Sequence, residues 1–158
     1  MKKELLKGLT MLMVVVALAV ATAVVSAHAQ SSKVVADIPF EFSVGFMMMP
    51  AGEYSAEIQT NANNALMIRS ADGRLNAVRL SQETDRAKNN KTYARFVFHR
   101  YGERYFLAEV WNGGDKTGRQ LLISLEEKAI ERELASTPGN SDTAKNIYET
   151  VEILAALR

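Results

Sequence analysis

Short segments in which apolar and polar residues alternate occupy most of the chain after residue 33. A period of two is typical of a strand with one buried face, because successive side chains of a strand point to opposite sides. Turn residues such as Pro50-Ala51-Gly52 and Asp72-Gly73 separate the segments. The pattern predicts strands at about residues 34–44, 53–59, 65–70, 75–80, 92–100, 104–111 and 146–155.

The first and the last of these strands carry alternatives. Pro39 has no N–H group to donate, so the first strand is expected to lie at a sheet edge or to carry a bulge. The segment 146–158 fits both an alternating strand and a helical spacing, and a strand is preferred. The polar residues 81–91 and the glycine-rich residues 112–118 are expected to form exposed loops.

Residues 93–111 predict a hairpin with Gly102 at its tip. An odd-length loop would place six apolar residues on one face and would set opposite charges across from each other on the second face. An even loop would oppose charged and apolar residues, so the odd register is expected. It pairs Phe98 with Phe106, Phe96 with Ala108, and Ala94 with Val110; on the second face it pairs His99 with Tyr105, Val97 with Leu107, Arg95 with Glu109, and Tyr93 with Trp111.

One helix is expected at about residues 124–135. Ser124 and Glu127 have the spacing of a capping box, and Pro138 with Gly139 prevents the helix from continuing. Apolar residues recur at helical spacing, as is typical of a helix that packs on a sheet: Leu122, Leu125, Ala129, Ile130 and Leu134. The expected fold is mainly β, an antiparallel β-sandwich or small barrel with one α-helix in its C-terminal half.

The N-terminal segment 1–29 has the pattern of a signal peptide helix. A lysine-rich start precedes an apolar run from Leu9 to Val25. Small residues at Ala27 and Ala29 then predict cleavage before Gln30. The alternative is an uncleaved membrane anchor, since about 17 apolar residues is the shortest length that spans a bilayer. The sequence therefore predicts export to the periplasm or the extracellular space, with membrane contact only through this segment before cleavage.

Removing that segment changes the charge balance. The whole chain of 158 residues has a net charge of +1, whereas residues 30–158 form one expected domain with a net charge of −1. Such a balance gives no field that would attract nucleic acid. The chain has no cysteine, which excludes disulfides, thiolate metal sites and a lipoprotein anchor. His99 is the only histidine left, so neither a metal site nor a cofactor is expected.

Several residues could carry chemistry. His99 would have to serve any Ser–His–Asp arrangement, but no Gly-x-Ser-x-Gly motif accompanies it. The run Met47–Met49 could supply soft ligands for copper, but consecutive residues of an extended chain cannot all face one ion. The loop Gly113–Gly118 lacks the spacing of a phosphate-binding loop. No catalytic residue is therefore assigned, and an enzyme is not the preferred interpretation.

An aromatic face of the 93–111 hairpin is the candidate ligand site. Aromatic rings stack on sugar rings or bases, and neighbouring polar groups add hydrogen bonds. A glycan or an envelope protein would fit such a face. The alternative is that the helix at 124–135 covers it and turns it into core. The residues of this candidate site are Tyr93, Arg95, His99, Tyr105 and Trp111.

Several sequence motifs resemble those of a family of small, uncharacterised secreted proteins of soil bacteria. The motifs begin with Ile38-Pro39-Phe40-Glu41-Phe42, Pro50-Ala51-Gly52-Glu53-Tyr54 and Phe98-His99-Arg100-Tyr101-Gly102; they continue with Arg104-Tyr105-Phe106-Leu107, Trp111, Gly118-Arg119 and Glu131-Arg132-Glu133-Leu134-Ala135. The resemblance covers most of residues 30–158. It implies export and a shared β-rich fold, and it transfers no site.

The sequence as a whole favours an exported, non-enzymatic binding or structural module of the cell envelope or extracellular space. Two alternatives remain at this point. The first is a small hydrolase that uses His99. The second is an interaction subunit that pairs with a partner strand through the predicted edge near Pro39.

Overall fold

The computed structural model describes residues 33–58, 64–85, 92–113, 117–136 and 147–158. The chain divides into two units, Met1–Ser31 and Ser32–Arg158, and the description below concerns the second unit. The expected signal segment 1–29, with Ala27, Ala29 and Gln30 at its cleavage point, lies outside the described residues. In the described part of the chain no helix has the length and apolar character needed to cross a membrane.

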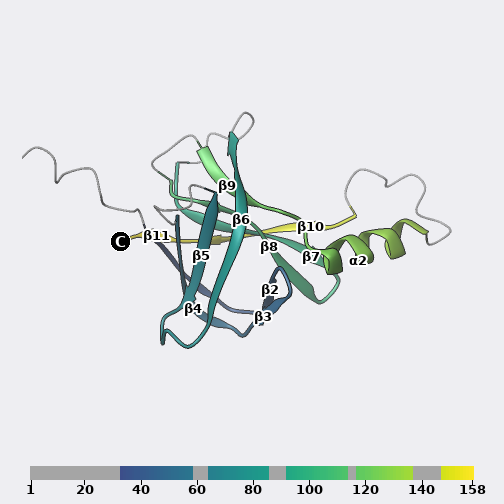
Figure 1. The fold of residues 1–158 in the computed structure, drawn as a ribbon, viewed down its shortest axis with the longest axis horizontal. Helices are drawn as coiled ribbons and strands as arrows, with labels where there is room; N and C mark the ends of the chain where they lie inside the picture. Colours follow the sequence, from purple (N-terminus) through teal and green to yellow (C-terminus); the bar gives the residue numbers. More distant parts are fainter. Residues whose placement is uncertain (1–32, 59–63, 86–91, 114–116, 137–146) are drawn as a thin grey trace, which may run out of the picture. The chain divides into compact units, whose positions relative to one another are not determined.

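The described fold is mainly β, with one helix, as the alternation predicted (Figure 1). Within the described residues, eleven strands form one mixed sheet whose main path is β10-β7-β8-β9-β6-β5-β4-β1-β11. Beside this path, β2 pairs with β3 and, in parallel, with β8. The strands are β1 (Val34–Ile38), β2 (Phe42–Val44), β3 (Met47–Met49), β4 (Gly52–Ile58), β5 (Ala65–Ser70), β6 (Asn76–Asp85), β7 (Arg95–Tyr101), β8 (Arg104–Trp111), β9 (Thr117–Leu121), β10 (Glu149–Leu154) and β11 (Ala156–Leu157); the helix is α2 (Leu125–Ser136).

Two long segments connect the parts of this sheet. The first half of β6 pairs with β5, and its second half pairs with β9. At the other end of the sheet, β10 pairs with β7 and β11 pairs with β1, although only Ala155 separates β10 from β11. Figure 1 shows β10 and β11 running as one nearly continuous line. The two ends of the strand path are therefore consecutive in the chain.

Apolar side chains from most strands meet in one core. Its centre is aromatic: the ring of Phe42 makes edge-on contacts with Tyr54 and Phe98, which are both buried. Burial of such rings is the main source of stability for a domain without disulfides. The core cluster contains Val34, Ala36, Ile38, Phe42, Val44, Met49, Tyr54, Ala56, Leu66, Ile68, Ala77, Ala94, Phe96, Phe98, Leu107, Val110 and Leu121.

The expected first strand at 34–44 is divided in the structure. β1 ends at Ile38 and β2 begins at Phe42, so the chain changes pairing partners around Pro39. Proline lacks the N–H group that a continuous ladder would need there. The expected edge is present at Ala36–Ile38, which among the described strands pair with β4 alone. It is absent at Val34 and Val35, which pair with β4 on one side and β11 on the other. The chain then turns at Gly45, and the methionine run forms β3 opposite β2.

Parts of the two segments expected as loops, 81–85 and 117–118, belong to strands. β6 continues through Ser81–Asp85, and β9 occupies Thr117–Leu121 opposite it. The polar composition of both segments had indicated loops. Strand formation depends mainly on neighbours across the sheet, which composition does not reveal. Gly118 is needed in this pairing, since a Cβ atom there would lie 2.5 Å from the ring of Trp111. Elsewhere the expected ranges 53–59, 65–70 and 75–80 correspond closely to β4, β5 and the first half of β6.

The predicted register of the 93–111 hairpin was wrong. Its loop has two residues, and Gly102 takes the positive φ of 61° that a tight hairpin turn requires. His99 therefore pairs with Phe106, and Phe98 pairs with Leu107. A bulge at Ala108 then shifts the ladder by one residue, so that Arg95 lies opposite Trp111. The bulge keeps apolar side chains of β8 on the core side at both ends, an effect that simple alternation cannot reveal.

The helix occupies the expected range, but its expected apolar face is only partly buried. Ser124 caps it, since its Oγ accepts a hydrogen bond from the Glu127 N–H group at 3.0 Å. The buried helix residue is Glu127, whereas Leu125 is 87% exposed. Of the apolar residues expected to face the sheet, Ile130 and Leu134 are half-buried on the same side as Glu127, whereas Leu122, Leu125 and Ala129 are exposed. The segment after residue 146 contains strand β10, which confirms the preferred alternative.

Candidate functional site

A buried guanidinium group at one end of β7 forms the centre of the strongest candidate site. Arg95 lies between its directly paired neighbours, Trp111 on β8 and Leu154 on β10. Its guanidinium carbon is 4.7 Å from the centre of the Trp111 ring and 5.6 Å from that of the Tyr93 ring. Arginine stacks favourably on aromatic faces in this distance range. The tertiary structure thus brings together three of the five residues that the sequence nominated.

The hydrogen bonding of Arg95 is incomplete. The residue is only 4% exposed, and within the described part of the chain its Nε and Nη1 atoms have no hydrogen-bond partner. The nearest carboxylate oxygen, Oε1 of Glu152, is 3.6 Å from Nε and too far for a hydrogen bond. Burying a charged group without satisfying its donors costs several kcal/mol in typical proteins, on the order of 3–5 kcal/mol. An oxygen acceptor beside Arg95 would satisfy these two donors.

One carboxylate and one phenol lie beside that guanidinium, and a second carboxylate accepts from the Trp111 indole. Trp111 donates its indole N–H to Oε2 of Glu109 at 2.7 Å, and the Tyr93 hydroxyl lies 3.5 Å from Oε2 of Glu152. Tyr93 is 41% exposed and Glu152 is half-buried, so these two side chains connect the cluster with solvent. We call this group the Arg95 cluster; its members are Tyr93, Arg95, Glu109, Trp111 and Glu152.

A second polar cluster fastens helix α2 to the outer face of β7. His99 Nδ1 is 2.7 Å from Oε1 of Glu127, and since a carboxylate only accepts, the imidazole N–H donates. The Tyr101 hydroxyl donates to Oε1 of Glu131 at 2.8 Å and lies 3.2 Å from Oε1 of Glu127. The ring of Tyr148 stacks on His99 with 3.8 Å between centroids. We call these five residues the His99 cluster.

The two phenols of the His99 cluster, the buried Tyr101 and the half-buried Tyr148, are held in their neutral form. Burial, followed by the hydrogen bond to Glu131 and the charges of Glu127 and Glu131, raises the pKa of Tyr101 far above its ordinary value. Burial and the same two carboxylates raise the pKa of Tyr148. Both effects disfavour the charged phenolate. Tyr101 therefore remains a hydrogen-bond donor to the helix over the whole physiological pH range.

The expected aromatic face does not exist as one surface. Tyr105 belongs to the core side, where it stacks on Phe40 with ring centroids 3.9 Å apart. Trp111 is buried in the Arg95 cluster, and His99 lies under the helix. The predicted alternative, coverage by the helix, applies to His99 alone among the five nominated residues. The two-residue turn and the bulge explain this division, because they change which hairpin side chains are neighbours.

Sequence reasoning missed the acidic members of both clusters. The expected register placed Glu109 opposite Arg95. In the structure Arg95 lies opposite Trp111, and Glu109 joins the cluster through its hydrogen bond to the Trp111 indole. Nothing local marks Glu152, because β10 reaches Arg95 only through tertiary pairing. The i, i+4 spacing of Glu127 and Glu131 was a usable signal, since it sets two carboxylates on one helix face.

The contacts of His99 in the described residues differ from those that a hydrolase using this histidine would need. The side chain is 12% exposed and held by Glu127 and Tyr148. Among the described residues no hydrogen bond joins it to a serine, and the nearby Ser124 hydroxyl caps the helix. Nor does the described part of the chain contain a group of three or more acidic, histidine or cysteine side chains suited to a metal ion.

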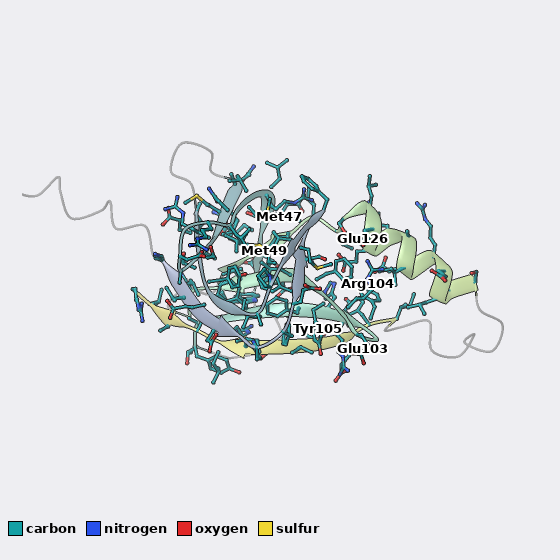
Figure 2. The ribbon with its side chains drawn as sticks, turned by 90° about the horizontal axis from the view of Figure 1, so that it is seen from below. Met47, Met49, Glu103, Arg104, Tyr105 and Glu126 are labelled. Carbon is teal, nitrogen blue, oxygen red and sulfur yellow. The ribbon has the colours of Figure 1, made fainter. Side chains whose placement is uncertain are left out.

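The methionine run forms a strand paired with β2 and does not gather its sulfur atoms. Figure 2 labels Met47 and Met49 apart from Arg104, which contacts Glu126 of α2. Met49 is buried in the core, whereas Met48 points the other way and is exposed. This alternation separates the sulfur atoms, as expected for consecutive residues of a strand. The run is a structural strand that covers part of the core.

This chain matches no protein-family model, no curated protein and no solved structure.

Proposed function

We propose that this protein is an exported, non-enzymatic binding module of the cell envelope or extracellular space, and that its ligand binds at the Arg95 cluster. The single observation that carries the proposal is the buried Arg95 guanidinium, whose Nε and Nη1 donors lack a hydrogen-bond partner in the described residues. The basic start, apolar run and Ala-x-Ala ending of residues 1–29 support export.

A ligand oxygen would supply what the cluster lacks. Ligand sites commonly combine aromatic surface with a few well-placed polar groups, and the Arg95 cluster has both. Rotation of the solvent-connected side chains, Tyr93 and Glu152, would give an oxygen atom access to the guanidinium. The cost of the unsatisfied donors would then be recovered on binding, which favours a bound state over the empty one.

The architecture that best supports such a module is a small closed barrel. β10 and β11 stand at opposite ends of the strand path, yet only Ala155 separates them. The Ala155 N–H group donates to the Ala94 carbonyl at 2.9 Å, and Lys33 and Arg158 exchange backbone hydrogen bonds. A single chain segment that supplies both end strands, β10 on β7 and β11 on β1, would close the sheet and remove two free edges.

The test is a ligand screen on protein purified after expression of the full chain. Trp111 is the only tryptophan, so its indole N–H gives one resolved nuclear magnetic resonance signal inside the cluster. We expect a ligand from a panel of oligosaccharides and small polar molecules to shift that signal. The variant Arg95→Met, which keeps the apolar stem but removes the donors, should weaken binding at least tenfold, on the scale of a charged hydrogen bond.

Two further variants make the screen decisive. Tyr93→Ala should weaken binding without unfolding the domain, because Tyr93 is 41% exposed and lies outside the strands. Phe46→Ala, which removes an exposed ring far along the chain at the β2–β3 turn, should leave binding unchanged. A panel without any Trp111-detected ligand, or binding that survives Arg95→Met and Tyr93→Ala, would exclude the Arg95 cluster as the site.

A further inference from the structure

The charges of the Arg95 cluster restrict the kind of ligand that it can hold. The guanidinium lies beside one carboxylate, since Glu152 is 3.6 Å from Arg95. A second carboxylate, Glu109, accepts a hydrogen bond from the Trp111 indole that stacks on the same guanidinium. A ligand carboxylate, sulfate or phosphate would bring a further negative charge to these acids. Like charges at such distances repel strongly where water is excluded.

A neutral polyol meets the same groups without that penalty. A hydroxyl group accepts and donates at once, so one hydroxyl can accept from Arg95 while a neighbouring hydroxyl donates to Glu152. Both hydrogen bonds would involve a charged partner and would therefore be stronger than those between neutral groups. The spacing of the protein groups suits adjacent hydroxyls, since the guanidinium and the carboxylate are neighbours across β7 and β10.

The exposed ring of Tyr93 supplies the remaining contact. It is the aromatic member of the cluster that faces solvent, and its hydroxyl lies within reach of Glu152. An aromatic ring beside paired donors and acceptors can pack against the apolar C–H face of a sugar ring. The Trp111 ring cannot do so, because the Gly118 backbone packs against it and Arg95 lies over it. One ring of stacking surface fits one sugar unit at a time.

We infer that the Arg95 cluster binds a neutral sugar of a glycan through adjacent hydroxyl groups, and that it discriminates against acidic sugars. This inference rests on the proposed function, since it names the ligand class of the same site. The residues act in separate roles. Arg95 donates to one hydroxyl, Glu152 accepts from the next, and Tyr93 packs against the sugar face.

The test compares an acidic oligosaccharide with its neutral methyl ester and with other neutral oligosaccharides. Tetragalacturonic acid and its fully methyl-esterified form share one skeleton, and neutral tetrasaccharides of glucose, mannose and xylose extend the series. The Trp111 indole signal reports binding for each probe. We expect the esterified and neutral probes to bind at least tenfold more tightly than the acid at low salt, and added salt to narrow that difference.

A variant that removes the charge of Glu152 tests whether charge repulsion causes the discrimination against acidic sugars. Glu152→Gln keeps the shape of the side chain, and we expect it to weaken neutral probes severalfold while it strengthens the acidic probe. Glu149→Gln is the matched control, because Glu149 lies on the same strand and pairs with Arg100 outside the cluster. If Glu152→Gln fails to fold, lowering the salt concentration on the unaltered protein tests the same repulsion.

The outcomes separate the inference from the function on which it rests. Tighter binding of the acidic probe would overturn the inference and leave the proposed function in place. The same holds if no sugar binds but another panel molecule binds in an Arg95-dependent way. Absence of any ligand at the Trp111 signal would overturn both.

Discussion

At the scale of single residues, burial and exposure divide side chains of the same chemical type. Phe98 is fully buried and touches Phe40 and Phe42, whereas Phe46 at the β2–β3 turn is 86% exposed and contacts Arg79. Alternation in the sequence identified Phe98 as core, because its strand pattern is regular. It could not place Phe46, which follows the glycine of a turn.

The contrast gives a stability prediction. Phe98→Ala should lower the free energy of unfolding by about 3–5 kcal/mol, since it removes a buried ring and leaves a cavity. Phe46→Ala is the matched control and should change the free energy of unfolding by less than about 0.5 kcal/mol. Chemical denaturation followed by circular dichroism measures both. Equal effects of the two variants would show that the core assignment is wrong.

At the scale of elements, α2 is held by polar contacts more than by apolar burial. Its buried residue is Glu127, and Glu131 adds a second contact to Tyr101, while Leu125 faces solvent. The helix and its cap were predictable because Ser124, Glu127 and the following breakers are local signals. Its contact face was not, since the partners His99 and Tyr101 come from a distant strand.

This attachment predicts loss of stability at alkaline pH. The pKa of Tyr101 in the folded protein is raised, so unfolded chains release the phenolic proton first. The contribution of Tyr101 to stability is therefore complete below pH about 10, the ordinary tyrosine value, and declines as the pH rises above it. Thermal unfolding at increasing pH, with tyrosinate absorbance as a second readout, measures this decline.

Substitution at Tyr101 separates its contribution from those of other tyrosines. Tyr101→Phe should lower the free energy of unfolding by about 1–3 kcal/mol near neutral pH, because the buried Glu127 and the half-buried Glu131 lose a donor. It should also reduce the steepness of the alkaline decline. Tyr93→Phe, which removes an exposed hydroxyl, should leave that steepness nearly unchanged. An identical pH profile for Tyr101→Phe and the unaltered protein would contradict this role.

At the scale of the whole molecule, the N-terminal segment predicts processing on export. We expect the exported protein to begin at Gln30, since Ala27 and Ala29 satisfy the small-residue requirement of signal peptidase. Mass spectrometry of protein from the periplasm or culture medium measures this end. Protein that retains Met1 and sediments with membranes would support the anchor alternative instead.

The amino-acid sequence by itself determined the mainly β class, the position of one capped helix, and most strand segments, because alternation, turn residues and caps are local. Only the tertiary structure decided the hairpin bulge, the extension of β6 to meet β9, and the arrival of β10 beside Arg95. These depend on pairing between residues far apart in the chain. The candidate site follows the same division. The local pattern nominated Tyr93, Arg95 and Trp111. Long-range strand pairing brought Glu152 to them and separated Tyr105 and His99 from them.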